Sequence, residues 1–580
     1  MTQGAIACGL AVAALLFCRG PHPSNLSFVF WIGSILVGFD LCARLERRLV
    51  RSPSPAVPAG QISLGGSERT VVALLVALSF GLSLHDLTHW RWSGTPDEAH
   101  FFNAAKTIAT GALEPFLFSE HGVFDIHPIL SSEYQALFMR VFGPTAFGWR
   151  LSSAAAVALA VACLYLLARR LWGAGAAIAA ALLFATTPLV VGFAHLGYNN
   201  TQVYPIVIGS LALVAGGARL ERLYLAGFVA GLGFYTFYPA RLAPLLGLLL
   251  GFFLGVFAIR GDGRRRALAF VCGCVLSIAP AVMLLPESLD KVSALTNLGG
   301  DPSVIAAHWL KAVLYPVYFE NPHHFQWTPI VDPISGPLCL LGLILCMANG
   351  RSGADRFLAS AYLLSALLVG ATSHHERPPL TRLLFLSPFA AMLAAVALQR
   401  VTGVVDRRVG RSPARAGAAL LVAFAALWGV LELQYNVRYR YHGCGDGTTT
   451  EAVRIASTMP PNAKIVYLQR SGSTMLMVDS VFDQYGMAER LIYGQGFDDE
   501  AKRALEEIEP PYIVINALED GEGRKAIEAI VERRFPGRGW EESAPGQPWN
   551  LRYSKINPSH RGGVTAGRRF PDTATPSVAR

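Results

Sequence analysis

The chain has 580 residues, of which 52% are hydrophobic and only 15% are charged, and its mean hydropathy is +0.39. Because soluble domains carry about a quarter of charged residues, this composition excludes an ordinary soluble globular protein. The formal net charge of +9 comes from short arginine-rich connections between apolar runs, which is the positive-inside pattern of membrane proteins. No basic face with interleaved aromatic residues lies outside those runs, so nucleic acid is not expected as a partner.

Apolar runs long enough to cross a bilayer, roughly 17–25 residues each, recur along most of the chain and predict a polytopic α-helical membrane protein with about thirteen spans. With the N-terminus in the cytoplasm, the arginine clusters fall inside and the histidines fall outside or near outer helix ends. The first run lacks a basic flank and is followed by another apolar run, so it is interpreted as a retained span. The expected spans are 4–18, 25–43, 70–88, 148–168, 174–194, 201–218, 222–238, 240–259, 267–285, 334–349, 357–373, 382–399 and 416–434.

The same topology places three long segments outside, at 89–147, 286–333 and 435–580. Within the first of them, 96–111 and 131–142 have the apolar spacing of amphipathic helices that lie along the membrane surface. The last segment is more highly charged and predicts a small α/β domain. Its expected strands are 464–468, 512–516 and 550–553, and its expected helices are 451–458, 498–508 and 523–535.

These patterns divide the chain into four parts. They are a membrane hairpin with a cytoplasmic linker at 1–69, a transmembrane domain at 70–435, a soluble α/β domain at 436–557 and a disordered tail at 558–580. Most of the nine cysteines lie in or beside apolar runs, so no disulfide framework is expected.

Two adjacent acids, Asp97 and Glu98, follow the apolar run that ends near residue 88. Carboxylates at the mouth of a membrane-embedded bundle are costly unless they are solvated or paired, which suggests chemistry at the membrane surface. Helix capping is the alternative, because Thr95 at the N-cap, Pro96 at N1 and Glu98 at N3 form a capping box. Capping explains Asp97 less well. The two roles are compatible if Glu98 caps the helix and Asp97 points into a cavity.

Further polar groups near outer helix ends have the chemistry to hold a phosphorylated sugar. His127, before Pro128, can donate a hydrogen bond to a phosphate, although a structural role in closing its turn is favoured. Tyr198, Asn199 and Asn200 offer hydroxyl and amide partners to sugar hydroxyls. Aromatic residues also gather at the membrane interface without any ligand, which is the alternative for Tyr198.

Arginines near two outer turns are candidates for binding a phosphate. Arg241 ends a short aromatic turn, where its guanidinium can bind a phosphate or extend to lipid headgroups. Arg377 and Arg382 lie in or beside a second outer loop. The histidine pairs at 323–324 and 374–375 lack the three-ligand arrangement of catalytic zinc, so a phosphate clamp is favoured over a metal site.

Short motifs follow one another in a fixed order: Pro96-Asp97-Glu98, His127-Pro128, Phe147-Gly-Trp-Arg150-Leu-Ser, Ala168-Arg169-Arg170-Leu-Trp-Gly, Gly197-Tyr-Asn-Asn200, Gly233–Arg241, Asp332-Pro333-Ile-Ser-Gly336 and Arg382–Pro388. This order resembles the polytopic GT-C glycosyltransferases of the dolichyl-phosphate-mannose protein mannosyltransferase type (glycosyltransferase family 39). It is also similar to their bacterial relatives that move aminoarabinose onto lipid A. The resemblance covers roughly residues 70–400.

The resemblance implies a GT-C fold and transfer, usually with inversion, of a monosaccharide from a polyprenyl-phosphate donor to a hydroxyl of a lipid, glycan or protein. The active site would face outward from a bacterial inner (plasma) membrane, with the C-terminal domain on the same side. The family's acidic residue in the first outer loop corresponds to Asp97, which implies that Asp97 is the general base. Two features depart from the family: Ile129 stands where a second proline is common, and the spans before residue 70 are additional.

The expected catalytic residues are Asp97 and Glu98, and the expected substrate-binding residues are Lys106, His127, Tyr198, Asn199, Asn200, Tyr235, Tyr238, Arg241, Arg377 and Arg382. Cationic side chains can stabilise a leaving phosphate, so no cofactor is assigned, and a divalent cation is possible but not required. The alternative function is a multi-span transporter or lipid flippase. That alternative calls for charged or broken helices at mid-membrane, whereas Asp40 lies near an inner helix end and can pair with Arg44 at i+4.

Overall fold

The computed structural model forms two compact units, Met1–Gly445 and Asp446–Arg580, each described here by itself. The residues it describes are 2–19, 24–49, 65–88, 96–119, 122–123, 127–217, 219–282, 301–318, 329–349, 352–371, 380–439, 447–469, 475–495, 503, 505–518, 521–543, 545 and 551–556.

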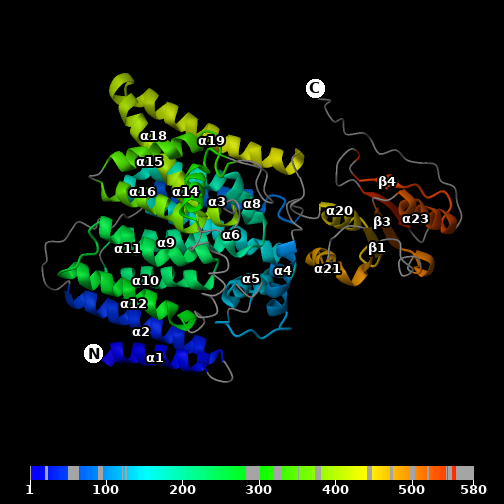
Figure 1. The fold of residues 1–580 in the computed structure, drawn as a ribbon, viewed down its shortest axis with the longest axis horizontal. Coiled ribbons are helices and arrows are strands. Elements are labelled where there is room, and N and C mark those ends of the chain that lie inside the picture. The colour runs from blue at the N-terminus through cyan, green and yellow to red at the C-terminus, as the bar shows by residue number, and fades with distance from the viewer. Residues whose placement is uncertain are drawn as a thin grey trace. The chain divides into compact units, whose positions relative to one another are not determined.

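The first unit is a bundle of helices (Figure 1), which confirms the predicted α-helical fold class. The apolar runs form these helices because a helix satisfies its backbone hydrogen bonds internally, as a lipid environment requires. Its elements are α1 (Thr2–Arg19), α2 (Leu26–Leu49), α3 (Gly66–Leu84), α4 (Pro96–Ala109), α5 (Ile129–Phe142), α6 (Ala146–Trp172), α7 (Ala174–Thr186), α8 (Pro188–His195), η2 (Asn199–Gln202), α9 (Val203–Ala215), α10 (Leu220–Gly231), η3 (Leu232–Tyr235), η4 (Tyr238–Leu242), α11 (Ala243–Phe253), α12 (Asp262–Val282), α14 (Pro302–Leu314), α15 (Ser335–Ala348), α16 (Gly353–Ser365), η5 (Ala366–Ala371), α17 (Leu380–Leu383), η6 (Leu384–Leu386), α18 (Ser387–Val409) and α19 (Arg411–Tyr439).

Each predicted span overlaps one of these helices or a bent pair of them. Within the described residues, five helices are long and apolar enough to cross a membrane, or six if α7 and α8, bent by 53°, form one span. The number of about thirteen spans therefore stays a prediction. The sequence did not predict α14, which lies in the second long outer segment. The expected pair between Asp40 and Arg44 is present, at 2.8 Å.

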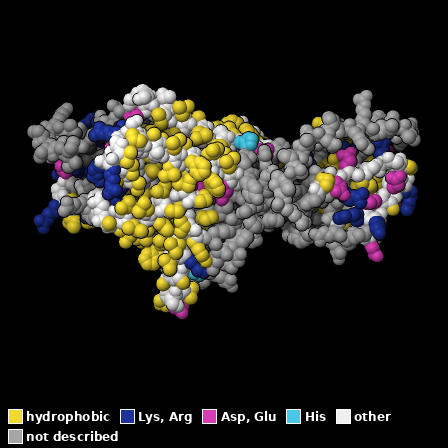
Figure 2. All heavy atoms as spheres, turned by 90° about the horizontal axis from the view of Figure 1, so that it is seen from above, with side chains coloured by type: hydrophobic (Ala, Val, Ile, Leu, Met, Phe, Trp, Pro, Cys, Tyr) yellow, Lys and Arg dark blue, Asp and Glu magenta, His cyan; other side chains and the backbone are white. Residues whose placement is uncertain are grey.

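Arginine-rich connections lie at the end of the helical unit where α6 and α11 end and α16 begins. We call this the basic end. Trp172, at the end of α6, donates a hydrogen bond from Nε1 to Oδ1 of Asp355 in α16 at 3.0 Å. Asp355 also forms an ion pair with Arg400 of α18. The Arg356 guanidinium lies 5.4 Å from the Phe253 ring centroid, which brings the end of α11 to the same place. Lys and Arg side chains gather toward one side of this unit, next to a broad hydrophobic surface (Figure 2).

The two predicted surface helices form as α4 and α5. On α4, the apolar side chains at the predicted spacing are buried, among them Phe101, Phe102 and Ile108. On α5, one face is buried, while Leu137 and Val141 on the other face are more than half exposed. This division agrees with a helix that packs on the bundle with one face and meets the membrane interface with the other.

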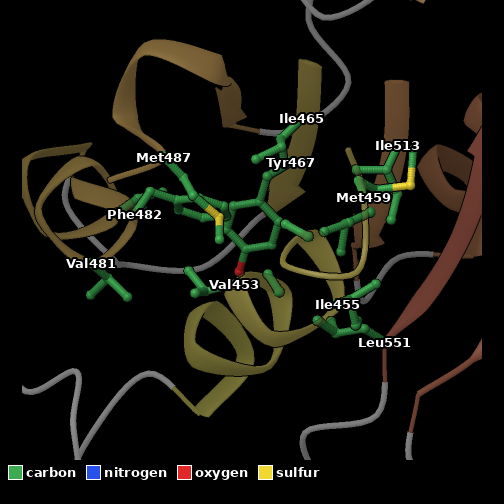
Figure 3. Close-up of a cluster of buried hydrophobic side chains, with 14 of the residues drawn as sticks. Val453, Ile455, Met459, Ile465, Tyr467, Val481, Phe482, Met487, Ile513 and Leu551 are labelled. Atoms are coloured by element: carbon green, nitrogen blue, oxygen red, sulfur yellow. The ribbon is translucent and has the colours of Figure 1, made fainter. Parts of the chain in front are cut away.

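The second unit is a small α/β domain with a five-stranded sheet in the order β2-β1-β3-β5-β4. The strand β1 pairs in parallel with β2 and β3, and β5 pairs antiparallel with β3 and β4. Helices α20 and α21 contribute to a core on one face of the sheet (Figure 3), and α23 covers the other face. The elements are α20 (Gly447–Ala456), β1 (Lys464–Gln469), α21 (Met475–Gln484), η7 (Ala488–Arg490), β2 (Leu491–Gln495), β3 (Tyr512–Ala517), α23 (Gly521–Arg534), β4 (Glu541–Glu542) and β5 (Arg552–Ile556).

The sequence anticipated this domain in part. Three expected strands overlap β1, β3 and β5, and two expected helices overlap α20 and α23. The helix expected at 498–508 lies largely outside the described residues, as does the tail at 558–580. The sequence did not predict α21 or β2. The composition of β2 explains why it was not predicted, since the strand contains Gly494 and has no clear alternation of apolar and polar residues.

Candidate functional site

The first turn of α4 places Asp97 and Glu98 in different environments. The helix begins at Pro96, a favourable first residue because its fixed φ suits the helix and its missing N–H needs no partner there. Acidic residues in this turn are also stabilised by the helix dipole. The Asp97 side chain is exposed and the Glu98 side chain is buried. The predicted N-cap, Thr95, lies outside the described residues.

The buried carboxylate of Glu98 pairs with Arg150, near the start of α6. Its Oε1 lies 3.0 Å from Arg150 Nη2, and both side chains are 0% exposed. Arg150 Nη1 also donates to the carbonyl oxygen of Leu87 at 3.0 Å, so one guanidinium joins α4, α6 and the segment after α3. Trp172 marks the far end of α6, about 33 Å away at roughly 1.5 Å per residue. The first turn of α4, with Asp97 and Glu98, therefore lies at the end of the bundle opposite the basic end.

The Glu98–Arg150 pair changes the interpretation of Glu98. A carboxylate without solvent contact, held by a guanidinium, is poorly placed to accept a proton from a substrate. The geometry supports a positioning role for Glu98, in place of the catalytic role expected from the sequence. Asp97 keeps an exposed carboxylate on the first turn, four residues before Phe101 and thus on the same face of α4.

His127 lies among aromatic rings beside that face of α4. Its ring centroid is 5.0 Å from that of Phe101 and 5.9 Å from that of Phe237. Its Nδ1 is 3.0 Å from Asn199 Nδ2. Because the amide nitrogen is a donor, Nδ1 accepts and the imidazole proton resides on Nε2. Burial, together with the charge of Arg241, lowers the pKa of His127 from 6.5 to about 4.

His127 is therefore neutral at ordinary pH, which has a measurable consequence. Between pH values of about 6.5 and about 4, the unfolded chain binds the proton that the folded chain excludes. The unfolding free energy contributed by His127 is thus complete above pH 6.5 and is lost as the pH falls toward 4, by about 1.4 kcal/mol per unit. We expect His127→Asn to reduce the drop in melting temperature on acidification, measured by fluorescence in detergent. Exposed His100→Asn is the control, and the same acid sensitivity in wild type and His127→Asn would contradict the assignment.

Asn199 contributes a second polar group to the cluster around His127. Its Nδ2 also lies 3.3 Å from Ser131 Oγ on α5. Its Oδ1 is buried and has no hydrogen-bond partner within the part of the chain that the structure describes. A buried acceptor without a partner is costly, so a ligand hydroxyl at this position would be favoured. Tyr198, the preceding residue, packs its ring 5.0 Å from that of Phe101.

Two arginines lie beside the same cluster. Arg241 is close enough to influence the pKa of His127, and its guanidinium is 5.8 Å from the Phe234 ring centroid. Arg382 is buried, with its guanidinium 5.3 Å from the Tyr238 ring centroid. Cations close to aromatic faces and polar amides form a setting that suits a phosphate group.

Asn200 connects this region to α17. Its Nδ2 donates to the carbonyl oxygen of Thr381 at 2.9 Å. Asn200, Phe237 and Arg382 help to line a cavity of about 10 Å³, which is room for about one water molecule. The structure thus brings together residues that the sequence proposed separately: His127, Tyr198, Asn199, Asn200, Tyr238, Arg241 and Arg382.

Two of the expected site residues, Lys106 and Tyr235, make other contacts. Lys106 lies over the Phe102 ring at 6.0 Å. The Tyr235 hydroxyl donates to the carbonyl oxygen of Ser277 at 2.9 Å and accepts from the Ala281 N–H at 3.1 Å, which indicates a structural role. Arg377 lies outside the described residues, as do the histidine pairs at 323–324 and 374–375. Within the described ranges, no group of three or more potential metal ligands occurs.

The sequence analysis noted the motif that contains Arg150 but did not predict its ion pair with Glu98. The signal was available, because an arginine at the start of a long apolar helix needs an acidic partner. Phe101 and Phe237, which enclose His127, were also not assigned to the site. Aromatic side chains are so common near membrane interfaces that their spacing alone does not indicate a binding site.

Comparison with known proteins adds a family match to this geometry. Residues 126–284 match the family described as dolichyl-phosphate-mannose-protein mannosyltransferase. The predicted resemblance is confirmed. This mannosyltransferase-type segment contains His127, Arg150, Asn199 and Arg241, whereas Asp97 precedes it.

Individual relatives match over a similar part of the chain. An undecaprenyl phosphate-alpha-4-amino-4-deoxy-L-arabinose arabinosyl transferase of Pseudomonas aeruginosa is 32% identical over 191 residues, 31% of this chain and 34% of the relative. The enzyme of the same name from Pseudomonas paraeruginosa is 34% identical over 187 residues, 30% of this chain and 33% of the relative. The match thus spans about a third of the length of these curated relatives.

Two solved structures match this chain at low sequence identity. ArnT from Cupriavidus metallidurans bound to undecaprenyl phosphate has 17% sequence identity and a TM-score of 0.46, over 83% of this chain and 97% of that chain. The oligosaccharyltransferase AglB from Archaeoglobus fulgidus, in complex with an inhibitory peptide and a dolichol-phosphate, has 13% identity and a TM-score of 0.45, over 84% of this chain and 74% of that chain.

Proposed function

We propose that this protein is a membrane glycosyltransferase that moves a monosaccharide from a polyprenyl-phosphate donor to a hydroxyl acceptor at the extracytoplasmic face. The observation that carries the proposal is a contact between the mannosyltransferase-type segment and α4. His127 of that segment packs against Phe101, which lies one helical turn after the exposed Asp97. The named activity of the Pseudomonas relatives, transfer from an undecaprenyl-phosphate sugar, supports the donor class.

In the proposed reaction, Asp97 accepts the proton of the acceptor hydroxyl as that oxygen attacks the anomeric carbon. A new glycosidic bond forms while the bond from the anomeric carbon to the phosphate oxygen breaks, and the electron pair leaves with polyprenyl phosphate. A single displacement of this kind inverts the anomeric configuration. Glu98 and Arg150 fix the first turn of α4, so the carboxylate of Asp97 is held at one position relative to the cluster.

The leaving phosphate gains charge, which Arg241 and Arg382 are placed to stabilise. Lys106 and Arg377 remain proposed as further cationic contacts. Neutral His127 can donate from Nε2 to a phosphate or sugar oxygen, and Asn199 Oδ1 can accept from a sugar hydroxyl. The proposal requires no metal ion, since side-chain cations supply the positive charge. The C-terminal α/β domain is proposed to lie on the same side and to orient the acceptor.

The full-length protein in proteoliposomes tests this function directly. The donors are short-chain polyprenyl phosphates that carry a radiolabelled hexose or pentose, and the acceptors are envelope glycolipids and membrane proteins. We expect label to move to an acceptor while an equal amount of polyprenyl phosphate is released. Movement of the intact donor between leaflets without a new glycosidic bond would instead indicate a flippase and would contradict the proposal.

A further inference from the structure

A groove of about 530 Å³ lies where α11 ends and α12 begins, within the usual size range of ligand pockets. Its lining is almost entirely apolar and includes a single charged residue, Arg264. The other lining residues are Leu248, Phe252, Phe257, Ala258, Ile259, Ala267, Leu268 and Val271. The groove is remote from the candidate functional site, because α11 starts just after Arg241 and the groove lies at its other end.

Several apolar side chains of the groove are exposed. Ile259 is 89% exposed and Phe252 is 67% exposed. On α12, Leu268 and Val271 line the groove, and Val275, at 58% exposed, extends the same face one turn further. The resulting i, i+3, i+7 stripe runs along a helix expected to span the membrane. Such a stripe offers a path for a hydrocarbon chain that starts at the groove.

Basic residues are concentrated in the connection between α11 and α12, which contributes to the groove. Arg260, Arg264, Arg265 and Arg266 lie within seven residues, with Asp262 as the single acid among them. Asp262 pairs with Arg265 at 3.2 Å. No carboxylate within the described ranges forms a salt bridge with the other three guanidiniums. The contact between Phe253 and Arg356 places this segment at the basic end of the bundle.

We propose that this groove binds an anionic phospholipid, with an acyl chain on the apolar lining and the phosphate at Arg264 and Arg260. A guanidinium binds phosphate oxygens through paired hydrogen bonds, and basic pockets between membrane helices on the cytoplasmic side hold anionic headgroups in this way. A zwitterionic lipid is disfavoured, because its ammonium group would face an excess of arginines. The inference does not depend on the proposed transfer reaction.

Native mass spectrometry of the full-length, delipidated protein tests the site, with phosphatidylglycerol and phosphatidylethanolamine titrated separately. We expect phosphatidylglycerol to bind more tightly. The variant Arg260→Gln/Arg264→Gln should lower its affinity by roughly tenfold or more, given the usual contribution of each basic residue near an anionic lipid. Ala267→Trp should lower it by filling the groove while keeping every charge.

The matched control is Arg407→Gln/Arg408→Gln, which removes the same charge from two exposed arginines at the end of α18. This control should bind phosphatidylglycerol like the wild type. An equal loss of affinity in both double arginine variants would show a general charge effect and would contradict the proposed site. Unchanged phosphatidylglycerol binding by Ala267→Trp would also contradict it, because the lipid would then not occupy the groove. Thermal melting and size-exclusion profiles of each variant establish that it is folded.

Discussion

Replacing Asp97 with Asn is expected to lower the rate of sugar transfer by about 10²- to 10⁴-fold, the usual contribution of a general base. Asparagine keeps the size of the side chain and its place in the first turn of α4 but cannot accept the acceptor's proton. The loss of one charge at the helix start costs only about 0.3–1 kcal/mol, so the protein should still fold. Initial rates with saturating donor, together with the amount of protein in the membrane, measure the two effects separately.

The matched control for this variant is Glu114→Gln, which neutralises another exposed acid of the same outer segment. Its transfer rate should stay within about twofold of the wild type, because no catalytic role is assigned to it. A wild-type rate for Asp97→Asn would remove Asp97 as the base. A similar loss in both variants would show that the overall negative charge of the segment matters, and would equally contradict the assignment.

The second large effect concerns the buried pair between Glu98 and Arg150. Removing one partner of a buried ion pair leaves an uncompensated charge and typically costs about 3–5 kcal/mol. Glu98→Gln and Arg150→Met are therefore each expected to lower the melting temperature strongly and to reduce the yield of folded protein. The combined variant Glu98→Met/Arg150→Met has no buried charge, so it should recover much of the lost stability.

A surface ion pair provides the comparison for this experiment. Glu133 and Arg140 of α5 pair at a partly exposed position. Glu133→Gln should change stability by no more than about 1 kcal/mol. If Glu98→Gln is as mild as Glu133→Gln, the buried pair does not fix α4 on α6. A double variant whose loss of stability equals the sum of the two single losses would also show that the two charges are not coupled.

The sequence predicted the helices of the first unit well because long apolar runs have few alternatives in a membrane. The amphipathic helices α4 and α5 were equally accessible, since Phe101, Phe102 and Ile108 recur at helical spacing. The α/β domain was harder to predict. Its short strand β2 becomes stable only by pairing with β1, and such pairing between distant residues has no strong local signal.

The candidate site shows the same limit. His127, Asn199 and Arg241 each had a plausible structural alternative in the sequence, and only their proximity distinguishes a cluster from isolated side chains. Tyr235 had the same local features as Tyr238, yet its hydroxyl is bonded to the backbone of α12. The partner of Glu98 was also beyond local reasoning, because Arg150 is 52 residues away in the chain.

The side of the membrane on which α4 lies is the central claim, because the proposed base must meet an acceptor outside the cell. Labelling of sealed, right-side-out membrane vesicles with a membrane-impermeant maleimide tests it, using Asp97→Cys and, at the basic end, the exposed Arg411→Cys. The parent chain with its native cysteines gives the background. We predict that position 97 is labelled in sealed vesicles and position 411 only after permeabilisation. Labelling of position 411 but not of position 97 in sealed vesicles would contradict the account.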